Sequence, residues 1–362
     1  PAARCATPGA PRAASYTKRW DTTSSIPGRI NRKLKQRAAE RHVRSSLQVL
    51  HGSAMTRLAD DQVALIIVGR DVSYFLEHHI RYHLARGVSH VVYVDNGSTD
   101  NSIEIAKRFP DMTIARCAAD FRLHEGRIRY LANTRFLSGG WRLAIDPDEL
   151  LDYPGSNRID LPELARRMRA RGHSAMVAQM LDMVPDGPVS AAAGIDFAQA
   201  ERIFDRFSLT EITKAPYHGS GLQLAWFLDQ NRISNSNIAI LFGGLRHAAF
   251  GENCCLTKHA LFRMEKGVVP QPHPHVTTGV SCTDFSAVLR HYKFAGDMLA
   301  REKKLLAENR VAHGETQLRV ARMEREGDMN LGTYAECQGF TVEGLVDRGF
   351  LKISDAAMKM LA

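Results

Sequence analysis

The chain has 362 residues, a length that allows one large domain or two of ordinary size. Hydrophobic residues make up 44% of it and charged residues 24%, which excludes wholesale disorder, a collagen-like chain and a coiled-coil rod. The net charge of +9 arises in residues 1–57, which hold 12 Lys and Arg against two acids, so the slightly acidic remainder argues against broad binding to a nucleic-acid backbone.

The first elements expected along the chain are a polar segment and a basic helix. Residues 1–28 are rich in Ala, Pro, Arg, Ser and Thr without apolar periodicity, so we predict disorder there. Residues 29–50 could form a basic helix that contacts acidic phospholipid or nucleic acid, or a solvated tail without a specific partner. Six cysteines without a CxxC pair fit a reduced compartment, and we expect the protein to be cytoplasmic.

From residue 63 the pattern predicts strands that alternate with helices. Short apolar runs predict the strands, and apolar residues at helical spacing predict the helices between them. The expected strands are 63–68, 90–94, 112–116, 141–146 and 174–180, and the expected helices are 74–86, 101–108, 125–138 and 161–170. This rhythm indicates an α/β fold with a doubly wound, mostly parallel sheet and helices on both faces. Further on, residues 286–307 predict one long amphipathic helix, and 333–354 a small terminal element.

Acidic turns follow the second and fourth predicted strands, at residues 95–100 and 146–149. Ligands of such sheets lie beyond the carboxyl ends of the strands, so both turns are expected at the binding edge. Asp146, Asp148 and Glu149 place three carboxylates within four residues, and their mutual repulsion favours a bound cation. Oxygen ligands suit Mg²⁺ or Mn²⁺. The alternative is a capped loop, because Asp-Pro-Asp is also turn chemistry.

Several segments together resemble one enzyme family. They are Val68-Gly-Arg-Asp71, Tyr93-Val-Asp95-Asn-Gly-Ser-Thr-Asp100, Trp141-Arg-Leu-Ala-Ile-Asp146-Pro-Asp148-Glu149-Leu, Met180-Leu-Asp182-Met-Val-Pro-Asp186-Gly, Gly243-Gly244, Leu256-Thr-Lys258, the His275 region and Leu289-Arg-His-Tyr-Lys293-Phe. Across residues 63–345 the chain resembles the nucleotide-sugar half of GT-A glycosyltransferases, closest to the bacterial family 2 branch related to family 92. The resemblance implies three parts: a basic N-terminal segment (1–57), a GT-A domain (58–310) and a helical C-terminal extension (311–362).

The resemblance also implies roles for individual residues. It assigns Asp146 and Asp148 to Mn²⁺ or Mg²⁺ on the sugar-nucleotide diphosphate, with His275 as a third ligand and His273 as its rival. It places Arg70, Asp71 and Asp95 around the nucleoside. Gly69-Arg70-Asp71 departs from the family's usual basic residue followed by Asn-Glu, so the base is not predicted. Lys258, and with less support Arg263, could contact the diphosphate.

An inverting transfer needs a carboxylate base for the acceptor hydroxyl. Asp182 is the favoured candidate because it follows a strand, while Asp186 fits a turn better. Glu149 would support the metal ligands or face the acceptor. Trp226 and Phe227 could form an acceptor platform or belong to the core.

The expected function is therefore metal-dependent transfer of a sugar from a nucleotide sugar to a glycan or lipid-linked acceptor, in surface polysaccharide or glycan synthesis. A peripheral contact through residues 1–57 would place it on the inner face of a membrane. A nucleotidyltransferase is the second hypothesis, although it needs a Gly-rich loop where the chain has a single glycine, Gly69. A non-enzymatic protein that binds a membrane or nucleic acid through residues 1–57 is the third.

Overall fold

The computed structural model describes residues 26–311 and 314–362. The chain divides into two units, residues 1–41 and 42–362. In the first, the described residues belong to helix α1 (Ile26–Ser45), which accounts for most of the predicted basic helix. Pro27 stands in its first turn, where a missing backbone N–H costs nothing. The predicted disorder of residues 1–28 lies outside the described residues, except that residues 26–28 are helical.

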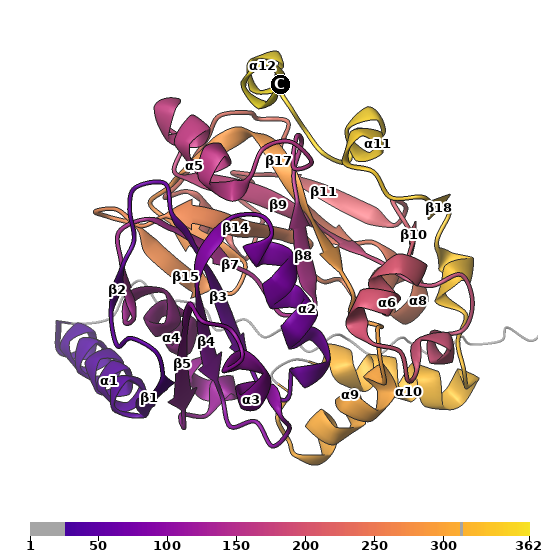
Figure 1. Ribbon diagram of the computed structural model, residues 1–362, viewed down its shortest axis with the longest axis horizontal. Coiled ribbons are helices and arrows are strands. Elements are labelled where there is room, and N and C mark those ends of the chain that lie inside the picture. The colour runs from indigo at the N-terminus through magenta and orange to yellow at the C-terminus, as the bar shows by residue number, and fades with distance from the viewer. Residues whose placement is uncertain (1–25, 312–313) are drawn as a thin grey trace, which may run out of the picture. The chain divides into compact units, whose positions relative to one another are not determined.

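A ten-stranded sheet forms the centre of the second unit (Figure 1). Its order is β1 (Leu47–His51), β5 (Met112–Cys117), β4 (Val88–Asp95), β3 (Val63–Gly69), β7 (Trp141–Ala144), β14 (Thr257–Arg263), β9 (Ala175–Asp182), β17 (Ser281–His291) and β12 (Arg232–Ile233), with β8 (Glu149–Asp152) paired to β17. Strands β5, β4, β3 and β7 run parallel, as do β9, β17 and β12, while β14 is antiparallel to both of its neighbours. The predicted fold class, an α/β fold with a mostly parallel sheet and helices on both faces, is confirmed.

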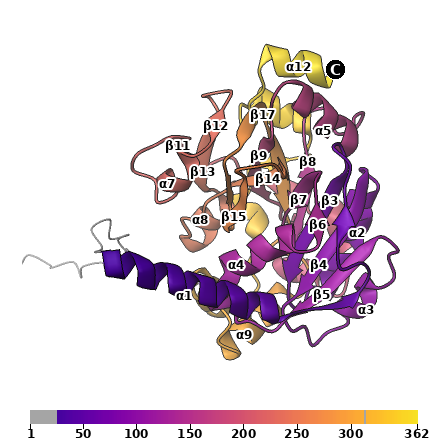
Figure 2. The same cartoon turned by 90° about the vertical axis from the view of Figure 1, so that its left-hand side faces the viewer.

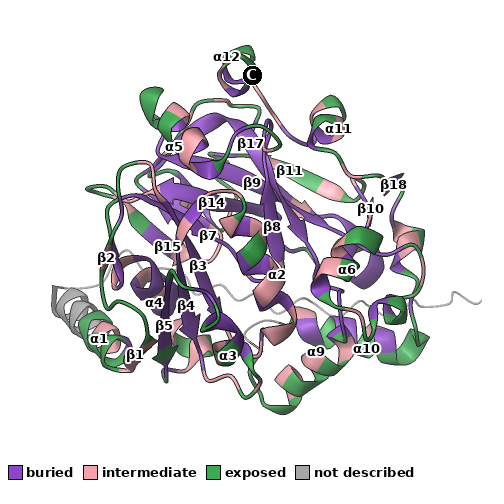
Figure 3. Ribbon diagram, in the orientation of Figure 1, coloured by how far each residue is buried: buried purple, intermediate pink, exposed green. Residues whose placement is uncertain are grey.

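Helices cover both faces of this sheet, so the strands bury the side chains on both of their faces (Figure 3). In β3 the side chains of Val63, Leu65 and Ile67 pack in a core with α2 (Ser73–Leu84), α3 (Ser102–Ala106), α5 (Leu161–Ala170) and α12 (Asp355–Leu361). The alternate residues of β3 pack in a second core with α4 (Phe121–Thr134) and α7 (Ala225–Leu228). Figure 2 shows α2 and α4 on opposite sides of the strands.

A third core surrounds the ends of β9 and β17. It contains residues of α6 (Phe197–Ile203), α8 (Leu245–Phe250), α9 (Met298–Ala307), α10 (Glu315–Glu326), α11 (Val342–Asp347) and the 3-10 turns η1 (Val189–Ala192) and η2 (Leu331–Tyr334). Small two-stranded sheets pair β2 (Thr56–Arg57) with β6 (Leu137–Ser138), β10 (Arg206–Phe207) with β18 (Cys337–Gln338), β11 (Ile212–Pro216) with β13 (Ala239–Gly243), and β15 (Val269–His273) with β16 (Val276–Thr278). The C-terminal part is thus mostly helical, as predicted.

The prediction of one helix over residues 286–307 is wrong. Residues 281–291 form strand β17, and only 298–307 form helix α9. Strand β17 is buried from Cys282 to His291 without alternation, and a continuous apolar run does not distinguish a buried strand from a buried helix. Helix α4 likewise begins at Phe121 rather than at residue 125, because the Asp120 side chain accepts a hydrogen bond from the backbone N–H of Arg122.

The sheet also extends upstream of residue 58, where we predicted the domain to begin. Strand β1 pairs with β5 through Leu47 and Cys117. Residues 311–362, predicted as a separate extension, fall within the same unit as residues 58–310.

Candidate active site

The acidic turn after β7 is closed by its own third carboxylate. Glu149 Oε2 accepts a hydrogen bond from the Asp146 backbone N–H at 2.8 Å, and the Glu149 N–H donates to the Asp146 carbonyl at 3.0 Å. Pro147 between them restricts the backbone further. Glu149 is fully buried, and burial raises the pKa of its carboxyl. Its side chain therefore shapes the turn from within.

Lys258 on β14 reaches the same turn from the neighbouring strand. Its Nζ lies 2.6 Å from Glu149 Oε1 and 2.8 Å from Asp146 Oδ2, and its side chain is 2% exposed. The other oxygen of Asp146 accepts from Arg129 on α4 at 3.1 Å. Burial raises the pKa of Asp146, but the charges of Arg129 and Lys258 outweigh it and hold that pKa well below its usual value. Asp146 is therefore an ionised carboxylate with both oxygens already paired.

Asp148 is joined to Asp182 through His291. His291 Nδ1 lies 2.6 Å from Asp182 Oδ1, and His291 Nε2 lies 3.4 Å from Asp148 Oδ2. Arg246 Nε donates to the second oxygen of Asp182 at 2.9 Å. Burial raises the pKa of Asp182, yet Arg246 and His291 together lower it to about 2. Burial lowers the pKa of His291, but Asp148 and Asp182 outweigh it and raise that pKa.

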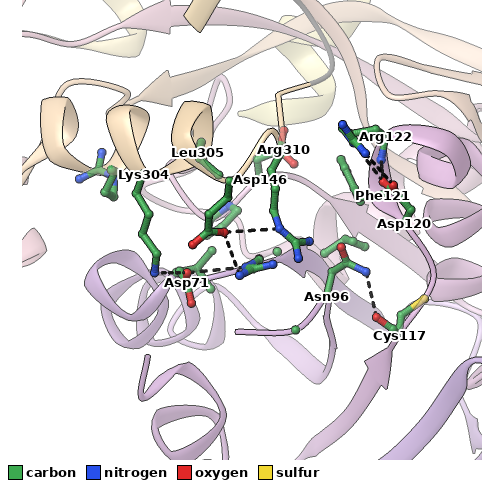
Figure 4. A pocket seen from close by; sticks show the side chains of 18 of the residues that line it. Asp71, Asn96, Cys117, Asp120, Phe121, Arg122, Asp146, Lys304, Leu305 and Arg310 are labelled. Carbon is green, nitrogen blue, oxygen red and sulfur yellow. Dashed lines mark hydrogen bonds and ion pairs between the residues drawn. The ribbon is translucent and has the colours of Figure 1, made fainter. Parts of the chain in front are cut away.

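A cavity of about 760 Å³ opens beside this turn. One wall consists of the carboxyl ends of β3, β4, β5 and β7 with the residues that follow them, and the opposite wall comes from α9 and its flanking residues. Figure 4 shows Lys304, Leu305 and Arg310 from the second wall across from Asp71 and Asn96. The cavity thus lies where parallel α/β sheets bind their ligands.

Crossed ion pairs join the two walls. Lys304 Nζ lies 2.7 Å from Asp71 Oδ2, and Arg70 lies 2.9 Å from Glu308 Oε2. Asp71 has φ +51° and also accepts from the Thr99 backbone N–H at 2.6 Å. Burial raises the pKa of Asp71, but the hydrogen bonds from Lys304 and from the Thr99 and Asp100 backbone, together with the Lys304 charge, outweigh it and lower that pKa. Each wall therefore contributes one cation and one acid to the two ion pairs.

The predicted site residues divide into two groups. Four line the cavity: Arg70, Asp71, Asp146 and Asp148. Five do not, namely Asp95, Glu149, Asp182, Lys258 and His275. Asp95 is fully buried and accepts from the backbone N–H groups of Gly97 and Ser98 at 3.1 and 3.0 Å, while Asn96 and Gly97 line the cavity in its place.

The predicted metal ligands do not gather into one cluster. His275 Nδ1 bonds to the Thr257 carbonyl at 3.0 Å, and burial lowers the pKa of His275 to about 3. Across residues 26–311 and 314–362, no three His, Cys, Asp or Glu side chains are arranged to hold an ion. The donor set nevertheless fits a hard cation that takes one or two protein carboxylates and completes its shell with water and phosphate, because Asp148 and Asp146 both face the cavity.

Some cavity residues were not predicted from the sequence. Arg301, Lys304 and Arg310 come from the α9 region, and Asn96 donates from its amide to the carbonyls of Cys117 and Ala119, both at 2.9 Å. His291, which contacts Asp148, belongs to a segment that the resemblance included but to which no role was assigned. No local sequence signal marked His291, because strand β17, which it ends, lacks the alternation that distinguishes a strand.

A buried histidine near the acidic turn predicts a pH-dependent stability. His79 on α2 is fully buried, its ring nitrogens make no hydrogen bond, and burial lowers its pKa to about 4 against the nearby charge of Asp148. A depressed folded-state pKa means that stability is complete above pH 6.5 and falls as pH drops towards 4. Between pH 7.5 and 5, the free energy of unfolding should fall by about 2 kcal/mol less in His79→Leu than in the wild type, as measured by urea unfolding. The exposed control His51→Leu should keep the wild-type pH dependence, and an unchanged His79→Leu profile would contradict the assignment.

The sequence matches no family model and no curated protein. Among solved structures, the chain is similar to glucosyl-3-phosphoglycerate synthase from Mycobacterium tuberculosis, solved with Mn²⁺, uridine diphosphate and glucosyl-3-phosphoglycerate (15% identity, 33% of this chain and 44% of that chain, TM-score 0.22). It is also similar to 4-diphosphocytidyl-2C-methyl-D-erythritol synthase (17% identity, 39% of this chain and 68% of that chain, TM-score 0.23). This chain spans less than half the length of the first synthase. Both matches are partial, and the fold assignment follows from the strand order of this chain itself.

Proposed function

We propose that this protein is a glycosyltransferase that moves a sugar from a nucleoside-diphosphate sugar to a hydroxyl acceptor. The observation that carries the proposal is that Asp146 and Asp148 line the same cavity as Arg70 and Lys304. Carboxylates for a divalent cation and side-chain cations for phosphate are the groups that a nucleotide diphosphate requires. The volume of about 760 Å³ lies in the range of small-molecule sites.

Asp148 and Asp146 would hold Mn²⁺ or Mg²⁺, which would neutralise negative charge on the departing diphosphate. Asp148 is the better direct ligand, because both oxygens of Asp146 are occupied by Arg129 and Lys258. His291 contacts Asp148, whereas the predicted His275 does not line the cavity; to become a third ligand, His291 would have to release a proton and its contact with Asp148. On the opposite wall, Lys304 can exchange its pairing with Asp71 for a phosphate oxygen.

The surroundings of Asp182 argue against its predicted role as the catalytic base. As a base it would have to leave its hydrogen bond to Arg246, and its pKa near 2 makes it a weak proton acceptor. Asp182 instead contacts His291, so it fits the role of holding His291, and through it Asp148, in position. Glu149 likewise fits a structural role better than a role in acid–base chemistry, since it closes the acidic turn and pairs with Lys258.

The finer assignments also remain proposals: membership of the family 2-like branch related to family 92, a glycan or lipid-linked acceptor, and action at the inner face of a membrane. None of the described helices is long and apolar enough to cross a bilayer. Attachment would then depend on the basic sequence around α1, and co-sedimentation with anionic vesicles, compared with neutral ones, would test it.

A thermal-shift screen of UDP- and GDP-sugars, with and without Mn²⁺, tests the proposed function directly. A ligand that binds only the folded state at 100 times its Kd stabilises it by about 2.7 kcal/mol, so we expect a rise in Tm for one donor class that requires the metal. The same rise should be lost in Asp148→Asn. A flat response to every nucleotide sugar would contradict the proposal, and release of pyrophosphate from a nucleoside triphosphate would favour a nucleotidyltransferase instead.

A further inference from the structure

A row of aromatic and imidazole rings leads from the surface towards the acidic turn. Trp226 on α7 is 72% exposed, the most exposed large hydrophobic side chain of the described residues. Its ring lies 5.0 Å from Phe227, Phe227 lies 6.3 Å from His273, and His273 lies 5.7 Å from His275, all measured between ring centroids. Helix α7 contacts β16, and β16 pairs with β15, so the row crosses from one element to the next.

The inner end of the row, His275, does not line the cavity but is bonded to the strand that holds the acidic turn. His275 Nδ1 bonds to the carbonyl of Thr257 at 3.0 Å, and the next residue, Lys258, holds Asp146 at 2.8 Å. Because a carbonyl only accepts, His275 Nδ1 carries the proton and Nε2 is the unprotonated nitrogen. The row therefore ends at His275 Nε2, a hydrogen-bond acceptor, near Asp146.

Polar groups flank the outer end. Asp229 follows Trp226 by three residues and so lies on the same side of the helical turn. His218 Nδ1 lies 3.6 Å from Asp229 Oδ1, and both side chains are exposed. An exposed aromatic face beside a carboxylate and an imidazole combines an apolar surface with hydrogen-bonding groups, as ligand sites do.

We propose that these four rings, Trp226, Phe227, His273 and His275, form a binding track for the pyranose rings of a carbohydrate acceptor. A pyranose has an apolar C–H face, which packs on an aromatic ring, and hydroxyl groups at its edge, which bond to neighbouring polar side chains. The inference rests on the proposed function for the direction of the track, because it runs to the turn where the donor sugar would be held. The flanking Asp229 disfavours an anionic occupant such as a phosphorylated chain or a nucleic acid.

Calorimetric titration of the full chain with maltotriose, cellotriose and chitotriose, without any nucleotide, tests the track. We expect one of the three to bind, and Trp226→Ala to weaken that binding about tenfold. Trp226→Tyr should recover most of the affinity because it restores an aromatic face. Leu123→Ala removes a side chain on α4 that is 70% exposed and outside the row, so this variant should bind like the wild type.

A second readout uses fluorescence. In a Trp20→Phe background, the described tryptophans are Trp226 and the fully buried Trp141, so a bound sugar should change the emission of Trp226. Absence of binding by all three trisaccharides, or equal affinity of Trp226→Ala and wild type, would overturn the track. Because these titrations contain no nucleotide, a trisaccharide that binds while no nucleotide sugar does would retain the track and reject the glycosyltransferase.

Discussion

Asp148→Asn is expected to lower the rate of sugar transfer at least about 100-fold while leaving the fold intact. The substitution keeps the size of the side chain and removes the charge that would hold the divalent cation, so stabilisation of the departing diphosphate is lost. Asp148 faces the cavity and its one described ion pair is with His291, to which an amide can still hydrogen-bond. Initial rates of transfer or of donor hydrolysis, over a range of Mn²⁺ concentrations, measure the effect.

Asp347→Asn is the matched control, because it removes one exposed carboxylate on α11 far along the chain from the acidic turn. This control should retain the wild-type rate. Undiminished, metal-independent turnover by Asp148→Asn, with Tm equal to that of the wild type, would show that the acidic turn does not carry the reaction.

Lys258→Met should destabilise the protein by about 3–5 kcal/mol, because it leaves the buried Glu149 beside Asp146 without the shared cation. Met keeps much of the length of the side chain, so the expected loss comes from the uncompensated charges. Urea unfolding at pH 7.5 measures the free energy of unfolding of each variant.

The double variant Lys258→Met/Glu149→Gln removes the buried negative charge together with its partner, and it should regain part of the lost stability. Lys107→Met is the control at an exposed pair with Glu104, where less than about 1 kcal/mol is expected. A loss below about 1 kcal/mol in Lys258→Met would mean that Glu149 takes up a proton or that water enters the turn.

The sheet could be predicted where local patterns determine the element. Val63–Gly69 and Val88–Asp95 are short apolar runs bounded by turns, and both are strands of the expected parallel set. Strand β17 could not be recognised because both of its faces are covered, which removes the alternation that marks a strand. Because this error placed His291 within a helix, His291 was not predicted to lie at the binding edge of the sheet.

Part of one cavity wall could be predicted. Asp146 and Asp148 line the cavity because each lies just past a parallel strand, whereas Arg70 and Asp71 were expected there only from the family resemblance. The opposite wall depends on contacts between residues far apart in the chain: Lys304 meets Asp71 across a separation of 233 residues. No local pattern encodes such a contact. Asp95, by contrast, ends strand β4 and is held by hydrogen bonds within its own turn, and a strand-end position alone cannot distinguish a lining residue from a turn residue.

The pairing of Arg70 with Glu308 and of Asp71 with Lys304 has a consequence for how the protein matures. Residue 308 must leave the ribosome before both of these ion pairs can form, so a nascent chain cannot close the cavity before that point. A nucleotide bound in the closed cavity would contact both the early and the late part of the polypeptide. Under the proposed function, donor binding should therefore slow protease cleavage after residue 297.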